Sequence, residues 1–145
     1  MKVGIKKVLP GAKIPTYGSE FSAGADLYAL LEEPCVIAPG ETVLLHTGIA
    51  MEIPEGYGGF IYARSGLGVK KGLAPANKVG VIDADYRGEI RVALHNHSAE
   101  THTVENGERV AQLVIAPFLK AEFELLEELE ETVRGDGGFG STGRR

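Results

Sequence analysis

The feature that most limits the fold of this chain is the close spacing of its short apolar or alternating runs. Runs such as GADLYAL, ETVLLHTGIAMEI and GEIRVALHNHS are bounded by proline, glycine and asparagine, for example at Pro39-Gly40. The pair Asn106-Gly107 stands between two alternating runs, which favours a hairpin with a tight turn. Many short strands joined by such turns are typical of an all-β sandwich or barrel. The 20 glycines, about twice the usual share, fit a chain with many turns.

Two segments carry helical signals. RSGLGVKK follows a strand-like run, and we predict one or two helical turns there, with Ser65 near the N-cap. In AEFELLEELEETV the apolar residues first alternate, at Phe123 and Leu125, and then recur at helical spacing. We predict that this segment begins as a strand and continues as an acidic connector.

The distribution of charge limits the classes of partner. The net charge is −5, and residues 122–136 hold seven of the 20 acids; the rest of the chain is close to neutral and has no basic stripe. Nucleic-acid binding is therefore not expected. No stretch has the length of a membrane span, and the chain begins without the apolar run of a signal peptide. The single cysteine, Cys35, is expected to be a small buried residue and fits a reducing, cytoplasmic location.

The C-terminal sequence RGDGGFGSTGRR, residues 134–145, supports two interpretations. A glycine-rich terminus is usually unstructured. GDGGFGST resembles a P-loop, but serine replaces the essential lysine and no helix follows, so a P-loop fold is excluded. Glycine amides, the hydroxyls of Ser141 and Thr142, the charge of Arg134 and the ring of Phe139 would nevertheless suit a mobile arm that orders over a bound nucleotide.

The stretch NKVGVIDADYRGE brings a carboxylate to the end of an apolar run. Val81 and Ile82 lead into Asp83, and Asp85 and Tyr86 follow. The two acids would share a face on a strand and diverge in a tight turn. Because an acid at the end of a buried strand is costly unless it is paired or used, Asp83 is a candidate general base, metal ligand or turn former.

Other polar residues suggest an anion site or contacts within the core. Arg64, Ser65 and the amide of Gly66 lie at the start of the predicted helix, where they form an anion site or a plain helix cap. Asp26 and Gln112 stand inside apolar runs, where a hydrogen bond within the core would account for them.

A metal site built from histidines is not favoured. His95 and His97 would share a strand face, with His102 nearby. However, HNHS resembles a turn, and no suitably spaced acid completes a ligand set.

Taken in order, these stretches resemble the five motifs of the trimeric dUTP pyrophosphatases (dUTPases). AGADLYA resembles the first, RSG the second, GVIDADYRG the third, GERVAQL the fourth and RGDGGFGSTG the fifth. Each motif is modest alone, but the five in order span residues 23–143, nearly the whole chain.

The resemblance implies a fold and an activity. The expected fold is a distorted β-barrel or jelly roll over residues 1–133, with one short helix, followed by a flexible lid over residues 134–145. The expected assembly is a symmetric trimer whose active sites are shared between chains. The expected reaction is the hydrolysis of dUTP to dUMP and pyrophosphate by a dUTP diphosphatase, with Mg²⁺ held by the phosphates and water rather than directly by protein ligands.

The resemblance also implies residue roles. Asp83 would be the general base that activates the attacking water, and Asp26 would lie near the metal and the arginines, contacting Mg²⁺ at most through water. The residues expected to contact uracil or deoxyribose are Asn77, Gly80, Val81, Ile82 and Tyr86. Those expected to hold phosphates are Arg64, Ser65, Gly66 and Gln112. The lid residues are Arg134, Phe139, Gly140, Ser141 and Thr142.

Two rival functions remain open from the sequence. A dCTP deaminase, or a bifunctional deaminase-pyrophosphatase, shares the superfamily, but the complete fifth motif favours the pyrophosphatase. A non-catalytic β-barrel that only binds a nucleotide belongs to another class. Asp83 is expected to face the phosphates, and a carboxylate in that position argues against a protein that only binds the nucleotide.

Overall fold

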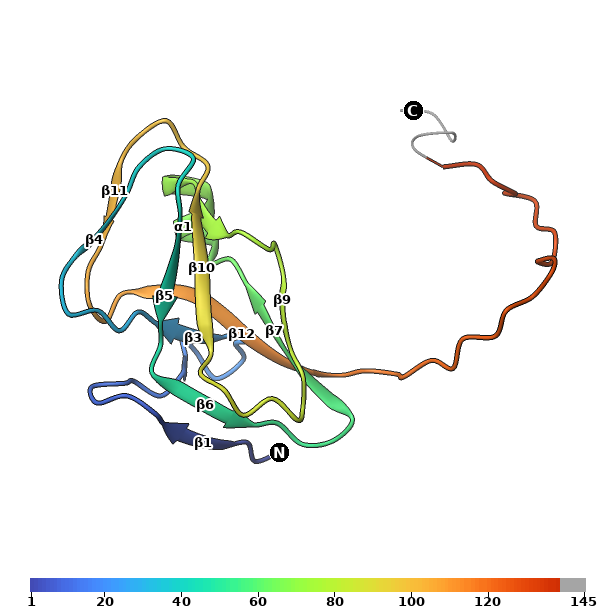
Figure 1. The fold of residues 1–145 in the computed structure, drawn as a ribbon, viewed down its shortest axis with the longest axis horizontal. Helices are drawn as coiled ribbons and strands as arrows, with labels where there is room; N and C mark the ends of the chain where they lie inside the picture. Colours follow the sequence, from blue (N-terminus) through green and yellow to red (C-terminus); the bar gives the residue numbers. More distant parts are fainter. Residues whose placement is uncertain (139–145) are drawn as a thin grey trace.

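The computed structural model describes residues 1–138 and shows short strands with a single helix, α1 (Ser65–Lys71) (Figure 1). The strands are β1 (Gly4–Lys7), β2 (Thr16–Tyr17), β3 (Ala25–Tyr28), β4 (Cys35–Ile37), β5 (Thr42–His46), β6 (Ile49–Glu52), β7 (Tyr57–Tyr62), β8 (Leu73–Pro75), β9 (Gly80–Ile82), β10 (Arg91–Asn96), β11 (His102–Val104) and β12 (Arg109–Pro117). The predictions of an all-β fold and of one short helix at RSGLGVKK are confirmed.

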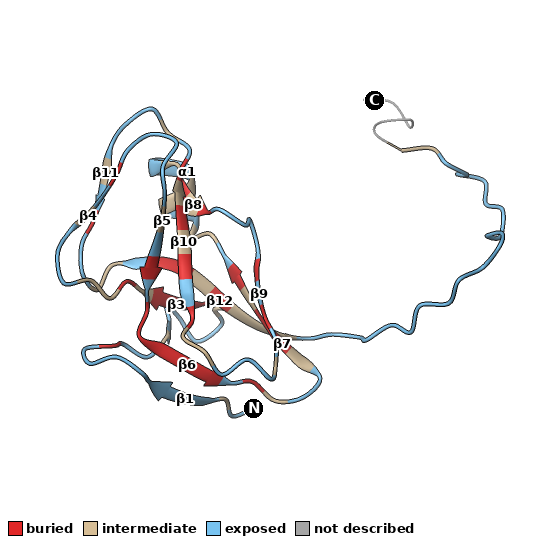
Figure 2. Ribbon diagram, viewed as in Figure 1, coloured by how far each residue is buried: buried red, intermediate tan, exposed pale blue. Residues whose placement is uncertain are grey.

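The strands form four small antiparallel sheets that enclose one core. The largest has the order β2-β3-β12-β7-β9, and the others are β5-β10-β8, β1-β6 and β11-β4. Figure 2 shows the buried segments on β3, β6, β10 and β12, where the sheets face one another. Leu27, Ile37 and Leu94 are fully enclosed at the centre. Burial of these apolar side chains provides the main stabilisation of the barrel.

Strand β10 shows how alternation in the sequence produces the core. Val92, Leu94 and Asn96 are buried, while the residues between them are more exposed. Asn96 is fully buried but satisfied, because its side-chain amide donates to the carbonyls of Ile37 at 3.0 Å and Glu100 at 2.7 Å. The prediction that HNHS forms a turn is wrong for its first half, since His95 and Asn96 belong to the strand.

The turn at Asn106-Gly107 exists, but the predicted hairpin does not. Gly107 has φ of 79°, a left-handed conformation that favours glycine. The flanking strands β11 and β12 pair with other partners, β4 on one side and β3 and β7 on the other. The Asn106 side chain accepts the Leu31 amide at 3.0 Å, and the Gly107 amide donates to Ala29 at 2.8 Å. These bonds attach the turn to the segment after β3, so the chain passes from one sheet to another.

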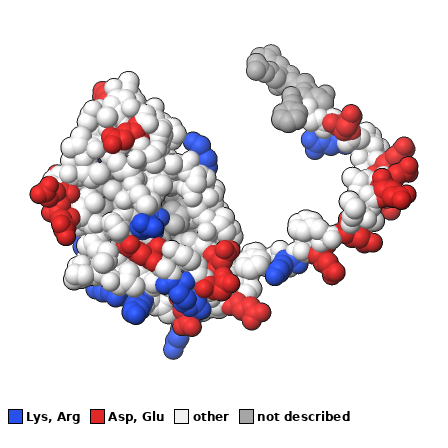
Figure 3. Space-filling view, viewed as in Figure 1, with Lys and Arg blue, Asp and Glu red and all other residues white. Residues whose placement is uncertain are grey.

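The strand predicted at the start of AEFELLEELEETV is also wrong. After β12 the described chain continues to residue 138 without strand or helix and leaves the barrel (Figure 1). Phe123 and Leu125 are 95% and 99% exposed. Figure 3 shows the acidic side chains along this segment. Their mutual repulsion and the missing amide hydrogen of Pro117 oppose continuation of β12.

Cys35 lies on β4, and the histidine pair lies at the end of β10. Cys35 is half-buried against the core rather than fully buried. Burial, and then the charge of Glu41, raise the pKa of its thiol. His95 Nδ1 lies 2.7 Å from the Thr42 hydroxyl, and its ring centroid is 4.3 Å from that of His97.

No helix in the described chain is both long and apolar enough to cross a membrane.

Candidate active site

The predicted substrate-contacting residues gather mainly around two separate cavities. The first has a volume of about 300 Å³ and is lined by Leu44, Ile61, Val81, Ile82, Asp83, Tyr86, Glu89, Ile90 and Arg91. The second has a volume of about 460 Å³ and is lined by Gly18, Ser22, Ala23, Gly24, Asp26, Arg64, Ser65, Gly66, Arg109 and Gln112. The two linings have no residue in common.

Asp83 projects from a turn at the end of β9. The strand ends at Ile82, and the Tyr86 amide donates to the Asp83 carbonyl at 3.1 Å to close the turn. This confirms the turn interpretation of DADYRG. The turn carries the Asp83 side chain to the surface, although the preceding residue, Ile82, is buried. Its carboxylate can therefore contact a ligand and solvent water without the cost of a buried charge.

Tyr86 is held over the same turn at one side of the first cavity. Its hydroxyl donates to the Glu89 carbonyl at 2.9 Å. A Cβ atom at Gly88 would overlap the Tyr86 hydroxyl oxygen, so only glycine leaves room for the ring in this position. The ring therefore has a defined orientation toward the cavity that Asp83 also lines.

The connection between β8 and β9, before Asp83, is exposed. Lys78 donates its amide to Pro75 at 3.0 Å, and Val79 donates to Asn77 at 2.7 Å. Gly80 is buried against Ile61, which leaves Asn77 at the exposed tip. In the described five-stranded sheet β9 is an edge strand that pairs only with β7. Half of its backbone amides and carbonyls therefore face away from the sheet and can form hydrogen bonds with a ligand.

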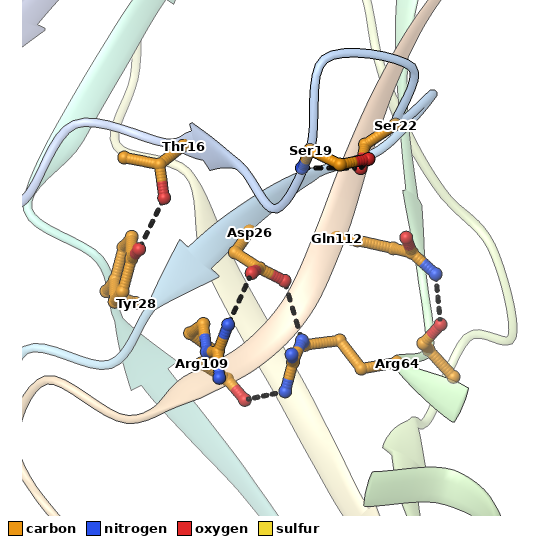
Figure 4. A network of polar contacts seen from close by, with 9 residues as sticks. Thr16, Ser19, Ser22, Asp26, Tyr28, Arg64, Arg109 and Gln112 are labelled. Atoms are coloured by element: carbon orange, nitrogen blue, oxygen red, sulfur yellow. Dashed lines mark hydrogen bonds and ion pairs between the residues drawn. The ribbon is translucent and has the colours of Figure 1, made fainter. Parts of the chain in front are cut away.

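A carboxylate in the second cavity holds two arginines (Figure 4). Asp26 Oδ1 lies 2.6 Å from Arg64 Nε, and Asp26 Oδ2 lies 3.2 Å from Arg109 Nη1. Arg64 also donates to the carbonyl of Arg109 at 3.4 Å. The Asp26 side chain is 12% exposed, whereas those of Arg64 and Arg109 are 26% and 52% exposed. Two guanidinium groups and one carboxylate leave this cluster with a net positive charge, which suits an anion.

Gln112 and the start of α1 complete this cavity. Gln112 lies opposite Asp26 in the sheet, and its amide donates to the Ala63 carbonyl at 2.9 Å. Gly24 packs directly on it, since a Cβ there would overlap Gln112 Oε1. Arg64 is the N-cap of α1 and makes no side-chain cap bond, so Ser65 is the first helical residue rather than the cap.

Sequence reasoning did not single out Arg109. An acid in the apolar strand β3 requires a cation, and Arg109 starts the neighbouring strand β12. This requirement could have suggested the pair, but only the register of β3 against β12 shows which cation is close enough.

Of the predicted lid residues, only Arg134 lies within the described chain, and it lines neither cavity. Arg134 lies in a turn beyond the barrel, where its Nε donates to Gly137 at 2.8 Å. Phe139, Gly140, Ser141 and Thr142 lie outside the described residues. Within residues 1–138, no group of three or more histidine, cysteine or acidic side chains could hold a metal ion.

The two cavities lie toward opposite ends of β7. Ile82 pairs with Gly59, so Asp83 lies beside Gly58, whereas Arg64 follows the other end of the strand. Gly58 and Arg64 are six residues apart, which corresponds to about 20 Å of extended chain. The carboxylate and the guanidinium cluster of one chain are therefore far apart for a single small ligand.

Substituting Asp26 tests the cluster. Asp26→Asn is expected to lower the free energy of unfolding by about 1–3 kcal/mol, because an amide group would then face two guanidinium groups. Urea unfolding measures the change. Glu52→Gln is the matched control, since the Glu52–Arg87 pair is exposed and 3.8 Å apart. It is expected to change stability by less than about 0.5 kcal/mol. Equal losses in both variants would contradict this account of Asp26.

A barrel that combines an exposed carboxylate beside an edge strand with a guanidinium cluster has the parts of a site for a phosphorylated small molecule. The chain matches the dUTPase family model over residues 11–143. It therefore belongs to the dUTPase family.

Relatives of known name agree with this assignment. The chain is 52% identical to the deoxyuridine 5'-triphosphate nucleotidohydrolase of Desulfitobacterium hafniense (strain DSM 10664 / DCB-2), over 90% of this chain and 87% of that protein. It is 49% identical to the protein of the same name from Hydrogenobaculum sp. (strain Y04AAS1) over the full length of both.

Solved structures share the fold, which confirms the expected dUTPase-like barrel. The Staphylococcus bacteriophage 80alpha dUTPase with dUPNHPP matches with a TM-score of 0.87, 30% identity and coverage of 98% of both chains. A mutant of the dUTPase from phage phi11 of S. aureus, described with a structural Mg(II) ion, matches with a TM-score of 0.79 and 27% identity. The match covers 90% of this chain and 100% of that one.

Proposed function

We propose that the chain performs the reaction of its family, the hydrolysis of dUTP to dUMP and pyrophosphate, at sites assembled between copies of the chain. The observation that carries this proposal is the division of the site residues. The Asp83 cavity has the groups expected for the nucleoside and the attacking water, and the Asp26 cavity has those expected for phosphates. The names of the relatives support the same activity.

Asp83 is the general base in this mechanism. Its carboxylate accepts a proton from water, the water oxygen forms a bond to the α-phosphorus, and the bond from that phosphorus to the bridging oxygen breaks. Pyrophosphate leaves with the electron pair. The exposed position of Asp83 on a closed turn allows such contact with water and substrate. A positioned base of this kind contributes about 10²–10⁴-fold to a rate.

The nucleoside end is recognised by β9 and Tyr86. The outward backbone groups of β9 and the side chain of Asn77 pair with the polar edge of uracil, and a pyrimidine with a different pattern of donors would leave them unpaired. The held ring of Tyr86 packs against the deoxyribose and leaves no space for a 2′-hydroxyl group.

The phosphates bind the Arg64 cluster of another chain. Ser65, Gly66 and Gln112 add donors around the same cavity. Both carboxylate oxygens of Asp26 already accept guanidinium hydrogen bonds, which leaves Asp26 to contact Mg²⁺ at most through water. The donor set therefore fits Mg²⁺ held by the phosphates and water, where the ion would neutralise phosphate charge.

A symmetric homotrimer accounts for the separation of the cavities and for the segment after β12. A cyclic assembly can place the Asp83 turn of one chain beside the Arg64 cluster of the next. Leu119, Phe123 and Leu125 are almost fully exposed on a segment that extends from the barrel, as expected for side chains that a neighbouring subunit covers. Residues 134–145 then close over a bound nucleotide as the lid, and residues 1–133 form the folded domain with its connector. The single cysteine favours a cytoplasmic location.

A substrate panel tests the function. Pyrophosphate release is measured from dUTP, dCTP, dTTP and UTP with Mg²⁺, and sedimentation of the same sample measures the oligomeric state. We expect release from dUTP alone and a trimer. Ammonia from dCTP would instead identify a deaminase, and binding of dUTP without turnover would identify a binding module. A monomer that turns over dUTP would contradict the shared site.

A further inference from the structure

Glu89 connects the substrate-facing turn to the interior of the barrel. It follows Gly88 and lines the same cavity as Asp83 and Tyr86. Its side chain is 17% exposed, so its carboxylate lies mostly within the structure. Its carbonyl accepts the Tyr86 hydroxyl at 2.9 Å. The residue is thus bonded to Tyr86 by its backbone, while its side chain is available for other partners.

Two groups at the end of β5 hold the Glu89 side chain. Oε1 accepts the Gly48 amide at 2.8 Å, and Oε2 lies 2.8 Å from His46 Nδ1. The next residue continues the attachment, because the Ile90 amide donates to Ile49 at 2.8 Å and its carbonyl accepts the Thr47 hydroxyl. Residues 89–90 are therefore fastened to residues 46–49 by side-chain and backbone bonds.

The segment that receives these bonds is rigidly packed. Thr47 and Ile49 are each 1% exposed. Gly48 has φ of 70°, and a Cβ there would lie 2.6 Å from the Leu30 side chain, so the backbone turn is enclosed by the core. The turn that carries Tyr86 is by contrast exposed. The Tyr86 ring is thus tied to the core through Glu89, whose carbonyl accepts the Tyr86 hydroxyl and whose side chain contacts Gly48 and His46.

We propose that Glu89 is a positioning residue that fixes Tyr86 through His46 and Gly48 and thereby sets the discrimination of dUTP against UTP. This inference rests on the proposed function, in which the Tyr86 ring excludes a 2′-hydroxyl. When the Glu89 side chain is removed, its carbonyl and the ring bonded to it gain freedom, and space opens for the ribose. The Tyr86 ring excludes a 2′-hydroxyl group less strictly when the ring can move.

The test compares kcat/KM for dUTP and UTP in full-length variants. Glu89→Ala is expected to lower the dUTP-to-UTP ratio about tenfold, the size of one lost positioning bond. Glu89→Gln keeps an acceptor for the Gly48 amide and can donate to His46 Nδ1, so its ratio is expected to stay within about twofold of the original. Glu33→Ala, which removes an exposed carboxylate between β3 and β4, is the matched control and is expected to leave the ratio unchanged.

Tyr86→Phe removes only the hydroxyl that reaches Glu89. It is expected to lower the ratio in the same direction, and the Tyr86→Phe/Glu89→Ala double variant is expected to lose no more than the larger single effect. If Glu89→Ala does not fold, Tyr86→Phe and His46→Ala decide the question. An unchanged ratio in the folded variants overturns the positioning role. Absence of dUTP hydrolysis by the original chain overturns the proposed function instead.

Discussion

Replacing Asp83 with asparagine is expected to lower kcat for dUTP by about a thousandfold while the protein still binds the nucleotide. Asparagine has nearly the same shape, so the turn that the Tyr86 amide closes on the Asp83 carbonyl is kept. Its amide cannot accept a proton from water at neutral pH. Single-turnover pyrophosphate release measures the chemical step, and equilibrium binding of dUTP measures the retained affinity.

Asp85→Asn is the matched control for this substitution. Asp85 is an exposed acid in the same turn and is expected to be dispensable for the chemical step. Its variant should keep kcat within about threefold, the range of surface changes away from the reaction. Equal losses in the two variants would show that the charge of the turn matters rather than a specific base. Full activity of Asp83→Asn would assign the base to another residue.

The strands could be predicted from the sequence because alternation reports burial directly. Val92 and Leu94 are buried and alternate with more exposed residues in β10, as the pattern indicates. Pairing could not be predicted in the same way. Asn106-Gly107 makes the turn that its residue types favour, but hydrogen bonds to Leu31 and Ala29 direct the two flanking strands into different sheets. Local residue preferences select a turn, whereas contacts distant in sequence select the partner strand.

The sequence indicated most residues of the candidate site but not how they are arranged. The motifs identified Asp26, Arg64 and Gln112, which the structure brings to one cavity. Arg109 was missed because only the register of β12 against β3 places it beside Asp26. The motifs also did not show that Asp83 and the Asp26–Arg64–Arg109 cluster, which we propose binds phosphates, are far apart within one chain, since that separation comes from the direction of β7.

Removing residues 134–145 is expected to lower kcat for dUTP by about a hundredfold or more without unfolding the barrel. Within residues 1–138 the last strand ends at Pro117 and residues 118–138 are largely exposed, so truncation after Val133 removes none of the strands or core contacts described. The melting temperature should therefore hardly change. A lid completes the site and excludes water only in the closed state, so its loss affects the rate more strongly than the fold.

Truncation after Gly143 is the matched control, because it removes two terminal arginines and leaves the fifth motif, residues 134–143, intact. The shorter deletion is expected to keep kcat within about threefold. Steady-state pyrophosphate release and thermal unfolding compare the three proteins. If both deletions reduce kcat equally, the terminal charges rather than the glycine-rich motif close the site. Full activity after truncation at Val133 would mean that the barrels alone complete the site, and residues 134–145 would then have no part in catalysis.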